Sequence, residues 1–375
     1  MMRQKTVACF SPYPEVGPSV RHRVLALGPI WQNAGYKLTL YPFMGTKFYK
    51  IRKRLDRLGT LLKVAHFAAA TGLTLVRASL CWRFDVVIIH REAFPLGPPW
   101  VERLICKVAK RTIFDLDDAI WNPPTQALNQ RAIFWYPQRT RDIVRNCDAV
   151  VVGNRHLHAY VQQAMALAPA CATQVYVVPT GYDDLCHHPL YPDLAREKNA
   201  RPTPIVVWIG SEGNAEYLIP LLPVLLQVHQ KTPFVLRLVG GADIFTIAQE
   251  GLAIERVLWT LSGEPMALLE SDIGIMPLPD SPYEQGKCGF KLVQYWSAAL
   301  PVVASPVGVN KSYVNGHNGR LAKEPTEWKE ALEGLLADSA LRRAMGQAGY
   351  ATYCESFTRR KCGDAWLPLL KALPV

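Results

Sequence analysis

The stretch that decides the fold runs from Gly286 to Ala322 and reads GKCGFKLVQYWSAALPVVASPVGVNKSYVNGHNGRLA. A glycine-containing loop here leads into an amphipathic segment that predicts a helix beginning near Phe290, and Pro301 opens a short buried strand. The first N–H groups of a helix lack partners and carry the positive end of its dipole, so they attract anions. The stretch therefore predicts a strand-rich α/β domain with an anion site at one helix start.

Two lysines and a glutamine make this helix start chemically specific. Lys287 and Lys291 are four residues apart, so both ammonium groups can reach one site if the helix begins early enough. Gln294, about one turn later, can hydrogen-bond a diol. The residue types alone leave open a plainer interpretation, in which the lysines are only a solvated basic helix start.

The same alternation of apolar strands and helix-length segments extends over the whole chain. Strands are predicted at 6–10, 36–41, 85–90, 112–115, 149–152 and 175–178, and again at 204–209, 235–239, 257–260, 273–276 and 302–304. Helices are predicted between the strands, one of them at 242–250, and a proline-rich polar tract separates the two sets. We expect two doubly wound α/β domains facing a cleft, with ligands beyond the carboxyl ends of the strands. Their expected bounds are 1–185 and 205–355, with a linker at 186–204 and a C-terminal helix at 356–375 crossing back to the first domain.

Composition bounds the classes of function. Of 375 residues, 42 are Lys or Arg and 31 are Asp or Glu, a formal net charge of +11 that suits anionic partners. The nine cysteines include no CxxC pair, which argues against a disulfide framework or a zinc site and favours a reducing compartment. No signal peptide is evident, and the apolar region 60–82 contains Lys63, His66 and Arg77, so we expect a cytoplasmic protein without a spanning helix.

Two short motifs in the deciding stretch carry a resemblance to a known family. Residues 301–308 (PVVASPVG) and 318–321 (NGRL) resemble the signature of retaining glycosyltransferases with the GT-B fold, family 4 or "group 1", and the GKCxFKLxQY pattern resembles a subset of it. The resemblance implies a nucleotide-sugar donor, a UDP-sugar more readily than a GDP-sugar, with no cofactor and no metal. The diphosphate would lie against Gly289, Phe290, Lys287 and Lys291, which makes both lysines candidate catalytic residues.

The sequence departs from the family pattern at two glutamates. Aligned on PVVA, they fall on Gly286 and Gln294, so the ribose contact would pass to Gln294 and the hexose contact to Asp280 or Glu284. Weaker resemblances place further donor-binding residues at the ends of the first two strands of the second half and in the loop after the first strand of the chain: Gly210, Ser211, Asn214, Gly240, Gly17, Ser19 and Arg21. Arg23, in the same loop as Ser19, is expected on the acceptor side.

An acidic cluster, Asp115, Asp117 and Asp118 in TIFDLDDA (112–119), follows a predicted strand. It resembles the opening DxDx[TV] of haloacid-dehalogenase phosphatases, with Asp115 as nucleophile and Asp117 as acid/base, although Ala119 breaks the pattern. A metal-binding DxD of a GT-A transferase is a second possibility. The family resemblance implies instead that Asp117 is a catalytic residue beside the sugar, with Asp118 and His90 on the acceptor side.

A basic segment at 47–63 points to a partner. It holds seven Lys or Arg residues and one aspartate, with leucines at helical spacing, which suits an anionic membrane surface. No nucleic-acid-binding signature accompanies it. We therefore expect a peripheral enzyme on the inner face of the membrane, acting on a saccharide or lipid-linked saccharide in cell-surface glycan synthesis (lipopolysaccharide, capsule or exopolysaccharide). A non-catalytic nucleotide-sugar-binding protein is the remaining alternative, suggested by the missing glutamates.

Overall fold

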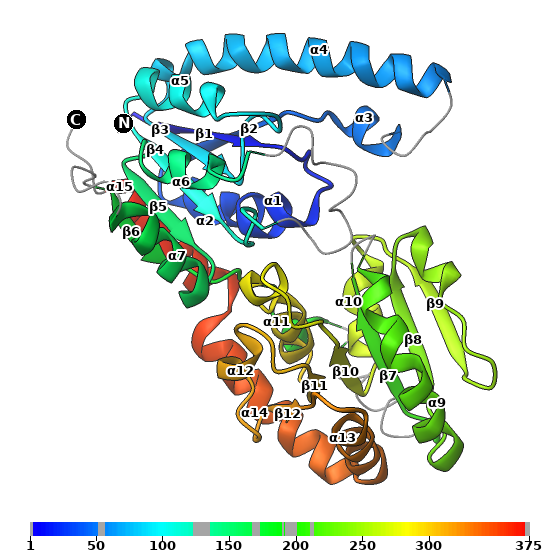
Figure 1. The fold of residues 1–375 in the computed structure, drawn as a ribbon. Coiled ribbons are helices and arrows are strands. Elements are labelled where there is room, and N and C mark those ends of the chain that lie inside the picture. Colours follow the sequence, from blue (N-terminus) through cyan, green and yellow to red (C-terminus); the bar gives the residue numbers. More distant parts are fainter. Residues whose placement is uncertain are drawn as a thin grey trace. The chain divides into compact units, whose positions relative to one another are not determined.

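The computed structural model describes residues 3–51, 57–122, 136–166, 173–189, 191, 201–210 and 214–371. The chain forms two compact units (Figure 1). Unit 1 comprises 1–181 together with 286–288 and 359–375, and unit 2 comprises 182–285 together with 289–358. The first unit thus ends at Gly181, four residues before the expected boundary, and includes a tripeptide from the second half of the chain.

Unit 1 is built on six parallel strands in the order β2-β1-β3-β4-β5-β6. These are β1 (Lys5–Ser11), β2 (Tyr36–Pro42), β3 (Val86–His90), β4 (Thr112–Leu116), β5 (Ala149–Val152) and β6 (Gln174–Val177). Along β1, Ala8 and Phe10 pack into one apolar cluster, whereas Val7 and Cys9 pack into another on the opposite face. Both faces of the sheet are covered, which is why the strands read as continuous apolar runs.

The helices of unit 1 fall into two layers. One cluster contains residues of α4 (Arg57–Ser79), α5 (Trp100–Val108), α6 (Arg139–Val144) and α7 (Arg155–Ala166), and the other contains residues of α1 (Pro18–Arg23), α2 (Gly28–Asn33) and α15 (Arg359–Lys371). The C-terminal helix α15 belongs to unit 1: Trp366 lies 5.5 Å from Trp31, ring centre to ring centre. A side chain at Gly363 would come within 2.6 Å of Ile30, so this glycine lets α15 approach α2 closely.

Unit 2 repeats the architecture with the order β12-β11-β10-β7-β8-β9. The strands are β7 (Ile205–Ile209), β8 (Val235–Gly240), β9 (Ile254–Leu258), β10 (Ile273–Met276), β11 (Val302–Ala304) and β12 (Gly319–Leu321). Val206 and Trp208 pack toward the cluster of α9 (Leu222–Lys231) and α13 (Pro325–Ala337), whereas Val207 and Ile209 pack toward α10 (Gly263–Leu269), α11 (Phe290–Ser297) and α14 (Ser339–Ser356). Shorter helices α3 (Thr46–Ile51) and α12 (Asn310–Tyr313) complete the two units.

Every strand predicted from the sequence is present within a few residues of its expected bounds. One predicted helix is wrong: the segment 242–250 forms only a short 3-10 turn at Ala242–Thr246. The expected linker contains a 3-10 turn at Leu185–His187, and residues 190 and 192–200 lie outside the described residues. Strand order reverses between β1 and β3 in unit 1 and between β7 and β10 in unit 2, so each sheet has one switch point where ligands of such folds bind.

Candidate functional site

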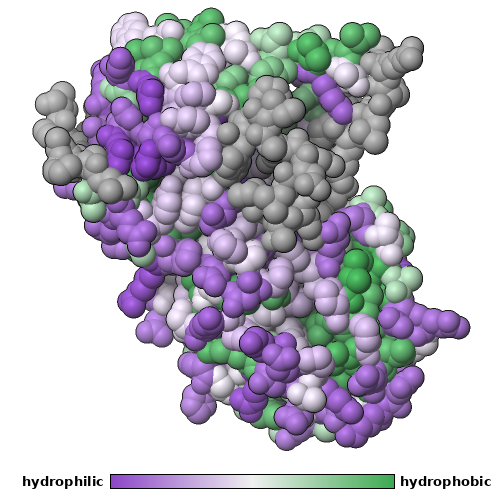
Figure 2. Space-filling view, viewed as in Figure 1, coloured by the Kyte–Doolittle hydropathy of each residue, from purple (hydrophilic) through white to green (hydrophobic). Residues whose placement is uncertain are grey.

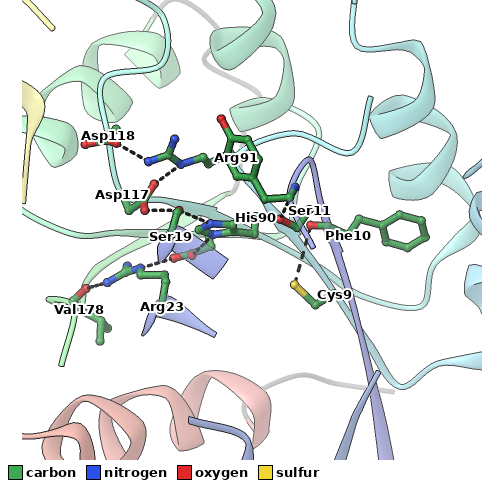
Figure 3. A network of polar contacts seen from close by, with 12 residues as sticks. Cys9, Phe10, Ser11, Ser19, Arg23, His90, Arg91, Asp117, Asp118 and Val178 are labelled. Carbon is green, nitrogen blue, oxygen red and sulfur yellow. Dashed lines mark hydrogen bonds and ion pairs between the residues drawn. The ribbon is translucent and has the colours of Figure 1, made fainter. Parts of the chain in front are cut away.

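A buried polar network occupies the switch point of unit 1 (Figure 3). His90 ends β3, Asp115 lies near the end of β4, and Ser19 follows β1 in α1, so three neighbouring strands deliver their side chains to one edge of the sheet. Asp117 and Asp118 follow β4 directly. The sheet order brings Asp117, expected beside the sugar, together with His90 and Asp118, expected on the acceptor side, and with Ser19, expected among the donor contacts.

Asp115 is the buried centre of this network. Its carboxylate accepts from Arg23 Nε at 2.9 Å and from His90 Nδ1 at 2.7 Å, and neither Asp115 nor His90 exposes any surface. Arg23 also donates to the backbone oxygen of Val178, which follows β6. The expected role of Arg23 as an acceptor-side contact does not fit this burial, because its guanidinium is enclosed between Asp115 and the neighbouring backbone. Its observed function is to neutralise a buried carboxylate.

Ser19 links His90 to Asp117. Its Oγ lies 2.6 Å from His90 Nε2 and 2.5 Å from Asp117 Oδ2. The Ser19 hydroxyl has one proton, which it donates to the ionised Asp117 carboxylate. Its contact with His90 is then a hydrogen bond only if Nε2 donates, while Nδ1 of the same ring faces the Asp115 carboxylate. The Ser19 hydroxyl therefore joins His90 and Asp117 in one polar network.

Arg91 fixes the two following carboxylates. Its Nε lies 2.6 Å from Asp117 Oδ1, and its terminal nitrogen donates to Asp118. Burial alone raises the pKa of Asp117, but the charges of Arg91 and His90 and the hydrogen bonds from Arg91 and Ser19 outweigh it and hold that pKa far below its usual value. A carboxylate with so low a pKa is a poor proton acceptor at neutral pH, so electrostatic stabilisation or substrate orientation suits Asp117 better than general base catalysis.

The enclosed carboxylates do not match a phosphatase. Asp115, the nucleophile of that hypothesis, faces Arg23 and His90 with no exposed surface. Ala119 departs from the phosphatase pattern for a packing reason: a side chain on Gly286 would come within 2.3 Å of the Ala119 methyl group, so the two small residues are in tight contact. Within the described ranges, no group of three His, Cys, Asp or Glu side chains is arranged to hold a metal ion.

The tripeptide 286–288 packs onto these same strand ends within unit 1. Cys288 Sγ donates to the backbone oxygen of Asp117 at 2.9 Å, and Asn154 Nδ2 donates to the backbone oxygen of Gly286 at 3.0 Å. A side chain on Gly153 would come within 2.2 Å of the Cys288 sulfur. Burial raises the pKa of the Cys288 thiol, which keeps it protonated and in a packing role. The GKC tripeptide (286–288) and the DLDDA segment (115–119) are far apart in sequence but pack directly against each other.

Lys287, in the middle of this tripeptide, precedes the helix instead of lying on it. Helix α11 begins at Phe290, after Gly289 adopts the left-handed conformation with φ 64°. The geometry in which Lys287 and Lys291 share one helix face is therefore wrong. Lys287 is half-buried and belongs to unit 1, whereas Lys291 belongs to the first turn of α11 in unit 2.

The loop after β1 holds the remaining predicted residues of unit 1. Gly17 precedes α1, and a side chain there would come within 2.7 Å of the Tyr13 side chain, so close approach requires glycine. Arg21 points toward its neighbour, with its terminal nitrogen 2.9 Å from His22 Nε2. Burial and the charge of Arg21 lower the pKa of His22, so this histidine is neutral at physiological pH.

The candidate donor site of unit 2 is positioned by Tyr295. β7 and β10 pair only at Val206–Ile273 and Val207–Gly274, and beyond this point the Tyr295 hydroxyl lies between them. It accepts from Ile209 N–H at 3.1 Å and donates to Ile275 C=O at 3.0 Å, so it satisfies two buried backbone groups where the strands part. A side chain on Gly274 would collide with the Tyr295 ring, at 2.3 Å. Helix α11 is thereby fixed over the switch point.

Lys291 lies one turn before Tyr295 on α11. Its Nζ lies 5.6 Å from the centre of the Trp208 ring, a cation–π distance, and Trp208 is the penultimate residue of β7. Gly210 follows this strand, and a side chain there would come within 2.3 Å of Trp208. A side chain on Gly240, at the end of β8, would come within 3.0 Å of the backbone oxygen of Gly210. The ammonium group and two side-chain-free positions thus gather at the carboxyl edge of the sheet.

Gln294 supports a carboxylate that sequence analysis missed. Its Nε2 donates to Glu264 Oε1 at 2.9 Å, and Glu264 also accepts from Trp259 Nε1 and from the Tyr182 hydroxyl. Both Gln294 and Glu264 are buried. The amide expected to meet a ribose is therefore occupied in holding Glu264, whose carboxylate receives three donors beside α11. Glu264 lies 30 residues upstream of Gln294, and no local pattern marks it.

The two candidates for the hexose contact differ in exposure. Glu284 is fully buried and accepts from the hydroxyls of Tyr217 and Ser281, so it stabilises the loop before α11. Asp280 is exposed and accepts from Gln285 Nε2 at 2.8 Å. Asp280 is thus the more accessible of the two carboxylates.

Three further predicted donor contacts belong to unit 2. Phe290 is half-buried, with its ring 5.7 Å from Tyr182 in an edge-on arrangement. Asn214 is half-buried and its backbone oxygen accepts from Tyr217 N–H at 3.2 Å. Ser211 lies outside the described residues.

Comparisons with known proteins agree with this architecture. The family described as Glycosyl transferases group 1 matches residues 203–338, which lie in unit 2 apart from the tripeptide at 286–288. A comparison with curated proteins found no match. Among solved structures, the chain is similar to sucrose-phosphate synthase from Thermosynechococcus elongatus (TM-score 0.69, 17% identity, 98% of each chain) and to Anabaena HepE in complex with UDP and glucose (0.69, 13%, 98% of this chain and 100% of the other). It is also similar to a glycosyltransferase from Rickettsia africae (0.68, 15%, 98% of each chain). The chain has the GT-B fold, and its second unit matches glycosyl transferases group 1 over residues 203–338.

Proposed function

We propose that the protein is a glycosyltransferase that moves a sugar from a nucleotide-sugar donor to a saccharide or lipid-linked saccharide. The observation that carries this proposal is the first turn of α11, where Lys291 lies against Trp208 at the switch point of unit 2. The group 1 match over this unit and the GT-B fold support it.

The donor diphosphate would bind where α11 begins. The first N–H groups of this helix have no intrahelical partners, and the helix dipole adds to the charge of Lys291. The leaving nucleoside diphosphate gains negative charge as the glycosidic bond breaks, and one preorganised donor for such charge contributes ~2.7–4 kcal/mol. These groups would stabilise the leaving group without a bound metal, and we propose a metal-independent reaction with retention of configuration at the sugar.

We propose uridine as the base. The solved structures of HepE contain UDP or UDP-glucose, and that protein covers almost the whole length of this chain. A side chain at Gly240 would come within 2.7 Å of Ile244, so close packing at the end of β8 requires glycine there. Glu264 is buried and receives three donors, so it holds Gln294 of α11 and is a positioning residue for the donor site.

The network of unit 1 would serve the transferred sugar and its acceptor. Asp117 and Asp118 stay ionised beside Arg91, so they can order hydroxyl groups or stabilise positive charge on a sugar ring. His90 acts through Ser19 and is a positioning residue. We propose an acceptor in cell-surface glycan synthesis and a location at the inner face of the cytoplasmic membrane, supported by the basic sequence 47–63, part of which lies outside the described residues.

The test is a ligand panel followed by one pair of variants. Thermal shifts should be largest with UDP or a UDP-sugar among UDP, GDP, ADP and dTDP, because a ligand stabilises the folded state that binds it. Lys291→Ala should lower turnover about 100-fold or more with unfolding temperature unchanged, whereas Lys311→Ala, an exposed lysine of the same unit, should not. Magnesium-dependent phosphate release that Asp115→Asn abolishes would favour a phosphohydrolase instead. Donor binding without transfer or hydrolysis would favour a binding protein.

A further inference from the structure

Helix α4 lies on the outside of unit 1 and is attached through a narrow strip of residues. Its Phe67 ring packs between Phe43 and Phe94, at 5.2 and 5.8 Å between ring centres. Thr74 and Ala78, about two and three turns further along the same strip, are buried, and Ala70 and Leu75 pack against the same core. Figure 1 shows α4 as the outermost helix of this unit, stacked on α5. Only one side of the helix is thus used by the fold.

The opposite side of α4 is apolar and exposed. Leu61, Val64, Leu73 and Val76 are 69%, 65%, 49% and 57% exposed, and the residues between them on this face are Ala65, Ala68, Ala69 and Gly72. Within the described part of the chain, one helical segment is long and apolar enough to cross a membrane. It is Gly59–Ser79 of α4, and only 11% of its most apolar 18-residue stretch is buried in the protein. Figure 2 shows apolar surface along the edge where α4 lies. An exposed apolar face of this length indicates a binding surface.

A basic sequence precedes this face along the chain, and exposed tryptophans occur after it. Residues 47–63 carry seven Lys or Arg residues against one aspartate. After the C-terminal end of α4, Trp82 is 57% exposed. Trp100, which opens α5 and packs on Phe94 beside Phe67, is 41% exposed. A basic sequence joined to an exposed apolar helix face with tryptophans near it is typical of a helix lying at a membrane–water interface. Two copies of the chain joined through this face would bring like charges together, whereas anionic headgroups would neutralise them.

The sheet topology decides between lying on the membrane and crossing it. The chain enters α4 after β2 and leaves it before β3, and both of these strands pair with β1 in one sheet. A helix crossing a bilayer would place its two ends on opposite sides of a hydrocarbon core ~30 Å thick, which one compact sheet cannot accommodate. A helix lying flat leaves both strands on the same side. The fold is therefore compatible with an interfacial helix and not with a spanning one.

We propose that the outward face of α4, defined by Leu61, Val64, Leu73 and Val76, inserts into the interfacial layer of a bilayer that contains anionic phospholipid. The basic segment supplies the attraction, and the apolar face supplies the attachment that persists when salt screens the charges. This inference does not rest on the transferase activity. It adds an apolar docking surface to the basic segment that the sequence already indicated.

Vesicle flotation of the full chain tests the proposal. Wild type should float with phosphatidylcholine–phosphatidylglycerol vesicles and stay partly bound in high salt. Leu61→Gln/Val76→Gln should lower the partition coefficient at least tenfold. Leu261→Gln/Leu258→Gln, two unit 2 leucines of matching exposure (68% and 56%), is the control and should float like wild type. UDP binding should be the same in all three proteins, which separates this test from that of the transferase.

Two results would overturn the proposal. The first is flotation of Leu61→Gln/Val76→Gln equal to that of wild type. The second is a lipid-free wild-type dimer in sedimentation equilibrium that the same variant converts to monomer, since a second copy would then cover the face. Quenching of tryptophan fluorescence by brominated phosphatidylglycerol gives an independent readout: it should occur in wild type and decrease in Trp82→Phe.

Discussion

Replacing Asp115 by asparagine should destabilise unit 1 strongly. The change leaves the shape of the side chain nearly intact but removes the charge that faces Arg23 Nε at 2.9 Å and His90 Nδ1 at 2.7 Å. Breaking a buried ion pair from one side costs about 3–5 kcal/mol, because the remaining charge stays buried without compensation. Two hydrogen bonds to a charged group, at about 1.5–3 kcal/mol each, give the same range. For a unit of this size, each kcal/mol lowers the unfolding temperature by about 2–4 °C, so the expected shift is roughly 6–20 °C.

The assay is thermal and urea unfolding followed by circular dichroism, with a double-mutant cycle. Arg23→Met should cost a similar amount, and the double variant should lose less than the sum, with a coupling energy of about 1–3 kcal/mol. Asp364→Asn, which removes an exposed partner of Arg360 in the same unit, is the matched control and should leave the transition unchanged. A loss below about 1 kcal/mol for Asp115→Asn would contradict the role of this carboxylate in compensating the buried Arg23 guanidinium.

Two further predictions concern packing and pH. Gly346→Ala should destabilise unit 2 by about 1–3 kcal/mol, since the new methyl group would come within 2.1 Å of the Ala299 backbone oxygen, whereas Gly334→Ala, with nothing within 4 Å, should be neutral or stabilising by about 0.5–1 kcal/mol in urea unfolding. Asp117 has a folded-state pKa below its unfolded value, so its stabilisation is present above about pH 4 and is lost as the pH falls toward the folded value. Unfolding free energies measured from pH 6 to pH 2 should fall less steeply in Asp117→Asn than in wild type, and parallel curves would contradict the assignment of the low pKa.

The sheets could be predicted from the sequence because their signal is local. Strands buried on both faces appear as continuous apolar runs, and the switch points follow from the order in which such strands alternate with helices. The prediction that His90 and the aspartates after β4 share an edge is of this kind. The helix predicted at 242–250 was wrong because an apolar stretch near a strand end does not specify how far a helical turn continues.

The contacts that define the site could not be predicted, because their partners are far apart in sequence. Glu264 meets Gln294 across 30 residues, and Gly286 meets Ala119 across more than a hundred and sixty. Neither pair has a periodicity or a motif of its own. Arg23 resembles a surface arginine in sequence, and only the three-dimensional arrangement shows its burial against Asp115.

The apolar periodicity of α4 does not indicate which side of this helix is exposed. The sequence distinguishes a basic segment at 47–63 and an apolar one at 60–82, but it does not show which side of the helix the fold uses. Exposure in the folded unit is needed to separate the anchoring strip at Thr74 and Ala78 from the opposite apolar face.

The most direct test of the central claim is the structure of the protein crystallised with UDP. The account predicts that the two phosphorus atoms lie at the start of α11, with phosphate oxygens within hydrogen-bond distance of Lys291 Nζ and of the backbone N–H groups that follow Gly289. UDP bound instead beside Asp115, with the start of α11 blocked by protein side chains, would contradict it.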